Sequence, residues 1–546
     1  MKWNKGVRLF PSIRTFASPS VGLVAILALT FYLRLLLFGQ SIDGDAGNMG
    51  YLAWRMSEGE VLVDLEGPGK PPLSSMAYAL FIHFFGPSPM GLKIFGTLFI
   101  LMAVLAIYWV ASQAYGKGVG LFAALLFGIF SSGPMIEGGS VNLETFLHFP
   151  YILAIGFFLK ASRSNRLRWY FLPGLAGGAA MLVKQVGGIV FIIFLFAGFH
   201  EWLRRKESHP LKEWSCRYIL LGAGALLPLS GVLIFYSSHG YSLGQLYHSL
   251  WISNLQYIRR GYEYTYFLSE FFSSMKRVLP ENSLLWIGTL FSGAYLVRKN
   301  WHGEWRTTDW VLLVWAIGSF GILWITGTFF WHYFLQILPP FCVFTAFGLV
   351  TAWRFSKSLP LRLKSAVLGI GAIILMASLI LLIKTDYPFY FSYHPVEQTV
   401  FQYKVREGVI DGYGVYNIVQ QEIAFYIRDH SDPQETIYVW GIAPQVYYLA
   451  QRRAATRYRN NYNMSQLVTR YPLKALAAYA PMVMEEIRRS PPAYIVQIFR
   501  LEDFPELQDF VRDHYTVVKR MEAPMPSFRI HLYRRRSDIR KSRDTN

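Results

Sequence analysis

Charged residues are scarce in this chain. They make up 16% of its 546 residues, against about a quarter in soluble globular domains. Hydrophobic residues account for 53%, and the mean hydropathy is +0.28. Mostly apolar stretches of about 18 or more residues recur, and each is long enough to cross a hydrocarbon core about 30 Å thick. The composition therefore excludes an ordinary soluble domain and predicts a polytopic α-helical membrane protein.

Cysteines and internal repeats are also lacking. Cys216 and Cys342 are the two cysteines, and both lie at or within hydrophobic segments, which excludes a disulfide framework. The sequence shows no repeat of fixed period, whereas a transporter normally carries one. The net charge of +19 does not indicate nucleic acid, because Lys and Arg collect in the cytoplasmic loops of membrane proteins.

The charge pattern supports a topology of eleven spans with a cytoplasmic amino terminus. This topology puts the strongly basic short loops on the cytoplasmic side, as the positive-inside rule requires. A twelfth span at 72–86 would put them outside, so that short apolar piece is predicted to be an interfacial or re-entrant helix. The first run is too long for a signal-peptide core and is predicted to be a retained anchor. The predicted spans are 20–39, 91–112, 118–133, 146–160, 169–183, 186–202, 217–237, 284–298, 310–326, 333–353 and 364–383.

Two domains follow from this topology. Residues 1–384 are predicted to form the membrane domain, with a first extracytoplasmic loop at 40–90. Residues 385–546 are predicted to form an extracytoplasmic α/β domain that ends in a basic tail, because strand and helix patterns alternate there. The expected strands are 435–441, 492–498, 515–521 and 528–535, and the expected helices are 417–430 and 472–489.

The first loop carries the clearest chemistry. Asp43 and Asp45 lie two residues apart, and Lys70 follows with two prolines directly after it. Carboxylates at this spacing can share a divalent ion, or one can act as a base while the other orients it. Lys70 offers a fixed positive charge for a phosphate. An ordinary solvated acidic loop is the alternative.

Further candidates lie at predicted outer ends of spans. Glu144 begins a helix, where an acid also suits the helix dipole. Lys184 lies between two apolar runs, which suggests function by default, with snorkelling as the alternative. His332 begins an outer helix and can contact a phosphate or a sugar hydroxyl, or simply lie in the interface. Arg259 and Arg260 lie among aromatic residues, which suits an anionic headgroup or a sugar ring, and equally suits membrane anchoring.

The order of these segments resembles the GT-C glycosyltransferases. The resemblance rests on "DGDAGNMGYLAWRMSEGE", then "KPPLSSMAYALFIHFFG", a run near "NLETF", an outer-end lysine and "HYFLQILPP". It covers roughly residues 15–385 and is closer to the branch of protein O-mannosyltransferases and the lipid A aminoarabinose transferase. The carboxyl-terminal "VWGIAPQVYYLAQRRAATRY" is similar to tails on some bacterial members.

The resemblance implies a mechanism. Such enzymes take a sugar from a polyprenyl phosphate on the outer face and give it to a hydroxyl, with a first-loop acid as base. Asp45 is the better match for that acid, and Asp43 is a near rival, because many relatives read Asp-Glu where this chain reads Asp-Gly-Asp-Ala. Glu144 matches the second acid, and Lys70 and Lys184 match positions suited to the carrier phosphate.

The sequence thus predicts an integral inner- or plasma-membrane glycosyltransferase. Its partners would be the polyprenyl-phosphate-linked donor, membrane lipid, and a glycan, lipid or protein acceptor, with no nucleic acid. No cofactor is required, since the departing phosphate carries its own charge, and a divalent metal at Asp43 and Asp45 stays open. A transporter or flippase of lipid-linked or anionic substrates and a non-enzymatic assembly protein are the alternatives. The predicted site residues are Asp45, Asp43 and Glu144 as catalytic groups, and Lys70, Lys184, Arg259, Arg260 and His332 at the donor phosphate.

Overall fold

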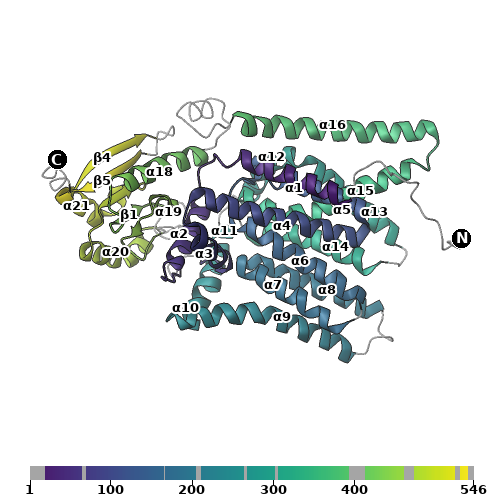
Figure 1. Cartoon of the computed structure of the whole chain (residues 1–546), viewed down its shortest axis with the longest axis horizontal. Helices are drawn as coiled ribbons and strands as arrows, with labels where there is room; N and C mark the ends of the chain where they lie inside the picture. The colour runs from purple at the N-terminus through teal and green to yellow at the C-terminus, as the bar shows by residue number, and fades with distance from the viewer. Residues whose placement is uncertain are drawn as a thin grey trace.

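A helical bundle and a smaller α/β unit make up the structure, which is a computed structural model (Figure 1). The α/β unit lies beyond one end of the bundle, and two short helices, α2 and α3, lie between them. The structure describes residues 19–63, 69–164, 166–204, 211–263, 267–301, 305–326, 328–392, 412–459, 472–522 and 529–538.

Eleven helices of the bundle follow the eleven predicted spans. Among the described residues, eight candidate spans are long and apolar enough to cross a membrane, and the other three predicted spans fall short in length or hydropathy. The helix at 117–130 has 14 residues and the helix at 171–183 has 13. The predicted class, a polytopic helical membrane protein, is confirmed. The eleven helices are α1 (Pro19–Leu36), α4 (Pro89–Tyr115), α5 (Lys117–Phe130), α6 (Leu143–Ser164), α7 (Phe171–Val183), α8 (Ile189–Arg204), α9 (Leu211–Ser238), α13 (Ser283–Asn300), α14 (Thr307–Ile325), α15 (Leu338–Ser356) and α16 (Leu361–Ser392).

Burial separates central helices from peripheral ones. Of the 18 most apolar consecutive residues of α6, 72% are buried inside the protein, whereas in α16 the share is 6%. Figure 1 accordingly shows α16 along one edge of the bundle. An apolar helix with so little protein around it is suited to lipid on its remaining surface.

Short helices cover the end of the bundle that faces the α/β unit. α2 (Gly44–Ser57) follows the first span and is mostly buried. α3 (Leu73–Phe85) has 13 residues, too few to cross a bilayer, as expected of an interfacial piece. The other helices between spans are η1 (Pro134–Ile136), η2 (Leu167–Tyr170), η3 (Gln185–Gly188), α10 (Leu243–Tyr247), η4 (His248–Ile252), α11 (Ser253–Glu263), α12 (Phe267–Glu281) and η5 (Trp331–Ile337).

The C-terminal unit is a small mixed sheet with helices, as its alternating pattern predicts. The strand order is β2-β1-β3-β5-β4, with β2, β1 and β3 parallel and β5 antiparallel to both its neighbours. Ile437, Val439, Ile495 and Val496 from β1 and β3 are fully buried. The strands are β1 (Thr436–Trp440), β2 (Arg453–Ala454), β3 (Tyr494–Gln497), β4 (Tyr515–Glu522) and β5 (Arg529–Arg535), and the helices are α18 (Gly412–Asp429), α19 (Gln445–Ala450), α20 (Pro472–Arg489), η7 (Leu501–Asp503) and α21 (Pro505–His514).

Candidate active site

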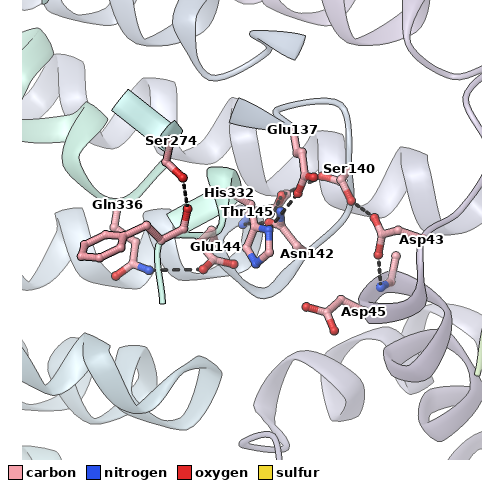
Figure 2. A network of polar contacts seen from close by, with 12 residues as sticks. Asp43, Asp45, Glu137, Ser140, Asn142, Glu144, Thr145, Ser274, His332 and Gln336 are labelled. Atoms are coloured by element: carbon pink, nitrogen blue, oxygen red, sulfur yellow. Dashed lines mark hydrogen bonds and ion pairs between the residues drawn. The ribbon is translucent and has the colours of Figure 1, made fainter. Parts of the chain in front are cut away.

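Polar groups from distant parts of the sequence meet at the end of the bundle beside α2. Figure 2 shows Glu137 and Glu144 beside His332, with Asp43 and Asp45 on the α2 side of the same network. They come from the start of α2, the segment between η1 and α6, the first turn of α6, and η5. The site therefore depends on the tertiary arrangement of several loops.

Asp43 links the start of α2 to the segment between η1 and α6. It is the N-cap of α2, and one carboxylate oxygen accepts a hydrogen bond from the backbone N–H of Ala46 at 2.8 Å. The other oxygen accepts from the Ser140 hydroxyl. Burial raises the pKa of Asp43 to about 6, and the charge of Asp45 acts in the same direction. Asp43 therefore changes charge close to neutral pH.

Asp45 lies in the first turn of α2 and pairs with Lys70. Its side chain is 49% exposed, so it loses only part of its hydration. Burial acts to raise the pKa of Asp45, but the positive charges of Lys70, His332 and Lys184 outweigh it and hold that pKa at about 2. Asp45 is consequently ionised at neutral pH.

The backbone before Lys70 is held by η4 and α11. The N–H of Gly69 donates to the carbonyl of Ser249 at 3.1 Å, and the Gly69 carbonyl accepts from the Asn254 side chain at 2.9 Å. A Cβ on Gly69 would lie 2.0 Å from the Ser249 hydroxyl and 3.1 Å from the Ser249 carbonyl oxygen, so a larger residue here would displace the Ser249 side chain. These hydrogen bonds restrain the backbone next to Lys70, whose side chain pairs with Asp45.

A second lysine–carboxylate pair joins Lys184 to Glu144. Glu144 is 1% exposed, and it also accepts from the Gln336 amide at 3.2 Å. Lys184 ends α7 in an extended conformation, and its ammonium lies 4.0 Å from the centre of the Tyr333 ring. The buried carboxylate thus has an opposite charge and a further donor beside it, as a buried ion requires.

His332 pairs with Glu137 rather than with either lysine-bound acid. The Nδ1 atom of His332 lies 2.8 Å from a Glu137 carboxylate oxygen. Glu137 adopts a left-handed backbone conformation with φ of 55°, which is unfavourable for a residue with a Cβ. Strain of this kind persists where the surrounding structure fixes it and is frequent at functional sites.

The structure brings together six of the eight predicted site residues. Asp43, Asp45, Glu144, Lys70, Lys184 and His332 all belong to the linked pairs described above. Arg259 lies on α11 with an exposed side chain, and the Arg260 side chain lies outside the described residues, as do the first-loop acids Asp64 and Glu66.

Three residues of the site lie beyond the predicted set. They are Glu137, Ser140 and Gln336. Gln336 follows His332 by four residues, so a search for further polar side chains in "HYFLQ" would have found it. Glu137 is a charged residue in the same short segment as Glu144, which is a local signal, whereas Ser140 carries none. The partners of the two residues, Asp43 for Ser140 and His332 for Glu137, lie 97 and 195 positions away.

The two aspartates do not face a common point as a ligand pair would. Both oxygens of Asp43 accept hydrogen bonds, and Asp45 is paired with Lys70. Within the part of the chain that the structure describes, no group of three or more His, Cys, Asp or Glu side chains is placed to hold a metal ion. A metal at Asp43 and Asp45 therefore stays a prediction, and no step is assigned to it.

The fold matches solved membrane-protein structures. ArnT from Cupriavidus metallidurans in the apo state has a TM-score of 0.57 and 13% identity, over 94% of this chain and 98% of that chain. The archaeal oligosaccharyltransferase AglB from Archaeoglobus fulgidus, in complex with an inhibitory peptide and a dolichol-phosphate, has a TM-score of 0.55 and 14% identity, over 89% of this chain and 70% of that chain. The chain has the GT-C fold.

The GT-C assignment also has support from the sequence. Residues 69–235 match the family described as dolichyl-phosphate-mannose-protein mannosyltransferase. The matched segment of this GT-C chain contains Lys70, Glu144 and Lys184. No curated protein matches the chain by sequence. The predicted resemblance to GT-C glycosyltransferases is thus confirmed at the level of the fold.

Proposed function

We propose that the protein is a membrane glycosyltransferase that moves a sugar from a polyprenyl-phosphate-linked donor to an acceptor hydroxyl. The observation that carries the proposal is the pair of lysine–carboxylate contacts, Lys70–Asp45 and Lys184–Glu144, at one end of a GT-C bundle. Among similar structures, ArnT from Cupriavidus metallidurans is bound to undecaprenyl phosphate, with a TM-score of 0.55 and 14% identity over 94% of this chain and 97% of that chain.

The site offers the groups that this transfer needs. The acceptor oxygen attacks the anomeric carbon as the bond from that carbon to the phosphate oxygen breaks. The acceptor proton passes to a carboxylate, for which Asp45 is the better candidate and Asp43 the rival. The polyprenyl phosphate departs with both bonding electrons, and Lys70 and Lys184 offset its growing negative charge.

The lysine pairs also couple donor binding to the strength of the base. A phosphate that attracts Lys70 weakens the ion pair that keeps the pKa of Asp45 near 2. Asp45 then binds a proton more readily at the moment when an acceptor has to lose one. His332, held by Glu137, is placed to donate to the phosphate or to a sugar hydroxyl.

The proposal includes an orientation. The site, α2 and the C-terminal unit lie at the same end of the bundle, and the turn between α15 and α16 lies at the other (Figure 1). That turn belongs to the strongly basic loop 354–364, which favours the cytoplasmic side. We therefore propose that the site and the C-terminal unit are extracytoplasmic.

Transfer by the purified protein tests the function. A panel of polyprenyl-phosphate sugars and acceptors should give turnover with the wild type, and Asp45→Asn should lower it by at least 100-fold while donor binding persists, because a missing base removes about 10²- to 10⁴-fold. Asp43→Asn and Lys70→Ala should be compared, with Asp429→Asn on the exposed end of α18 as the matched control. Full turnover in both aspartate variants would reject the assignment, whereas movement of an intact lipid-linked substrate without transfer would favour a transporter.

A chelator added to the wild type decides whether a metal is needed.

A further inference from the structure

The C-terminal unit packs directly on the helix that carries Asp45. α19 lies against α2, and the contact is made at two glycines of α2. A Cβ on Gly47 would lie 2.2 Å from the Cβ and 2.3 Å from the Cα of Gln445, and a Cβ on Gly50 would lie 3.0 Å from the Tyr448 ring. The two helices therefore approach to a distance that a single methyl group at position 47 would prevent.

Buried hydrogen bonds extend this contact to α3 and to the start of α4. The Tyr448 and Tyr78 hydroxyls lie 2.7 Å apart, and both residues are at most 1% exposed. The Tyr448 hydroxyl also donates to the carbonyl of Ser88, the N-cap of α4, at 2.9 Å. These bonds tie the C-terminal unit to the bundle at a defined position rather than over a loose polar surface.

A third set of contacts holds the far end of the same surface. The backbone N–H of Ala454 donates to the Tyr51 hydroxyl of α2 at 3.0 Å. The Gln451 amide donates to the Pro87 carbonyl at 2.9 Å, and the Tyr51 and Tyr447 rings lie 5.5 Å apart. All these contacts come from the stretch "QVYYLAQRRA" (445–454), a part of the carboxyl-terminal motif for which the sequence suggests no role.

The contact lies half a helical turn from the site. Gly47 follows Asp45 by two residues on the same helix, and Asp43 caps that helix. A helix moves as a rigid element over such a distance, so a shift at Gly47 displaces the Asp45 carboxylate from Lys70 by a similar amount. A misplacement of about 1 Å at a reacting group can cost about 100-fold in rate.

We propose that the C-terminal unit is a positioning element of the transferase: α19 seats α2 through Gly47, Gly50 and Tyr448, and so sets the place of Asp45 opposite Lys70. The inference rests on the proposed function for its effect on turnover. It makes the C-terminal unit part of the catalytic apparatus, although α19 itself provides no group that touches the reacting atoms.

Glycine-to-alanine variants test the proposal in the full-length protein. Gly47→Ala should lower kcat by about 100-fold without loss of affinity for polyprenyl phosphate, since Lys70 and Lys184 do not lie on α2. Gly222→Ala on α9 is the matched control, because a Cβ there meets nothing within 4 Å and both changes raise helix propensity equally. A Gly47→Ala enzyme with wild-type kcat, or one that loses donor affinity and kcat together, would overturn the proposal.

Hydrogen exchange separates this inference from the proposed function. Gly47→Ala should deprotect the α2 amides relative to wild type and Gly222→Ala, whether or not any donor is turned over. Unchanged α2 protection would overturn the proposal by itself, whereas an inactive wild type with the expected exchange pattern would count against the function alone. If Gly47→Ala does not fold, Tyr448→Phe keeps the ring and removes the buried hydroxyl, and it should lower kcat about fivefold with donor affinity retained.

Discussion

At the scale of single residues, the surroundings of Asp43 and Asp45 push their pKa values in opposite directions. Burial and the charge of Asp45 raise the pKa of Asp43 to about 6, whereas Lys70 and its neighbours hold the pKa of Asp45 at about 2 against the effect of burial. Two carboxylates with separated pKa values are frequent where acid and base roles are divided. The pair thus consists of one carboxylate that is ionised throughout the neutral range and one that titrates close to it.

The raised pKa of Asp43 predicts a pH-dependent stability. An acid whose pKa rises from 3.8 to about 6 on folding binds its proton more tightly in the folded state. Its contribution to stability is therefore full below about pH 4 and is lost as pH rises through about 6, by up to about 3 kcal/mol. Asp43→Asn keeps an N-cap, so it should gain melting temperature relative to wild type between pH 4 and 7. Asp429→Asn, the exposed control, should follow the wild type, and a constant difference for Asp43→Asn would contradict the pKa.

The Lys184–Glu144 pair predicts a strong non-additivity. Lys184→Met leaves the Glu144 carboxylate buried without its cation, which typically costs about 3–5 kcal/mol. Adding Glu144→Gln removes the uncompensated charge, so the double variant should recover most of the lost melting temperature. The measurement is thermal unfolding in detergent of the two single variants and the double variant. Equal and additive losses would show that the two groups do not interact.

At the scale of elements, the segment between η1 and α6 connects the first loop to η5. Ser140 donates to Asp43, and Glu137 accepts from His332, so one short turn fixes both. The turn holds Glu137 at φ of 55°. The left-handed conformation costs a residue with a Cβ about 1–2 kcal/mol, and this strain is offset by contacts that order the site.

Glu137→Gly separates the strain from the function of the side chain. Glycine accepts the positive φ, so the melting temperature should stay equal or rise. Turnover should nevertheless fall about tenfold or more, because His332 loses the acceptor that fixes its orientation. Glu137→Gln is the control, since its amide oxygen still accepts from Nδ1. A Glu137→Gly enzyme with full turnover would remove the His332–Glu137 pair from the mechanism.

At the scale of the whole molecule, the bundle has two chemically different ends. One end carries the site, α2, α3 and the docked C-terminal unit, and the other carries the α15–α16 turn (Figure 1). The first loop holds more acids than bases, whereas residues 354–364 hold four bases and no acid. This division gives the chain an orientation that labelling can measure.

Cysteine labelling checks the orientation in intact cells. In a Cys216→Ser background, Glu60→Cys should react with a membrane-impermeant maleimide from outside, since its side chain is 48% exposed. Lys357→Cys, also exposed, should react only after the membrane is permeabilised. The reverse pattern would invert the topology and place the site in the cytoplasm.

Local patterns in the sequence were sufficient for much of this protein. Apolar runs located eleven helices, and alternating patterns located four of the five strands, because hydropathy patterns act over one or two turns of chain. The orientation that the basic loops indicate stays a prediction. Asp45, Lys70, Glu144 and Lys184 were found as charges at the ends of apolar runs. The sequence therefore determined the class of protein and most of the candidate residues by itself.

Only the tertiary structure decided which of these residues act together. Lys70 meets Asp45 across 25 residues, Lys184 meets Glu144 across 40, and His332 meets Glu137 across 195. These pairings depend on which loops converge at one end of the bundle, and no local period encodes that. The same holds for α19, which reaches α2 across the whole membrane domain. Hydropathy fixes which segments cross the membrane, but the contacts among their ends follow from packing of the complete chain.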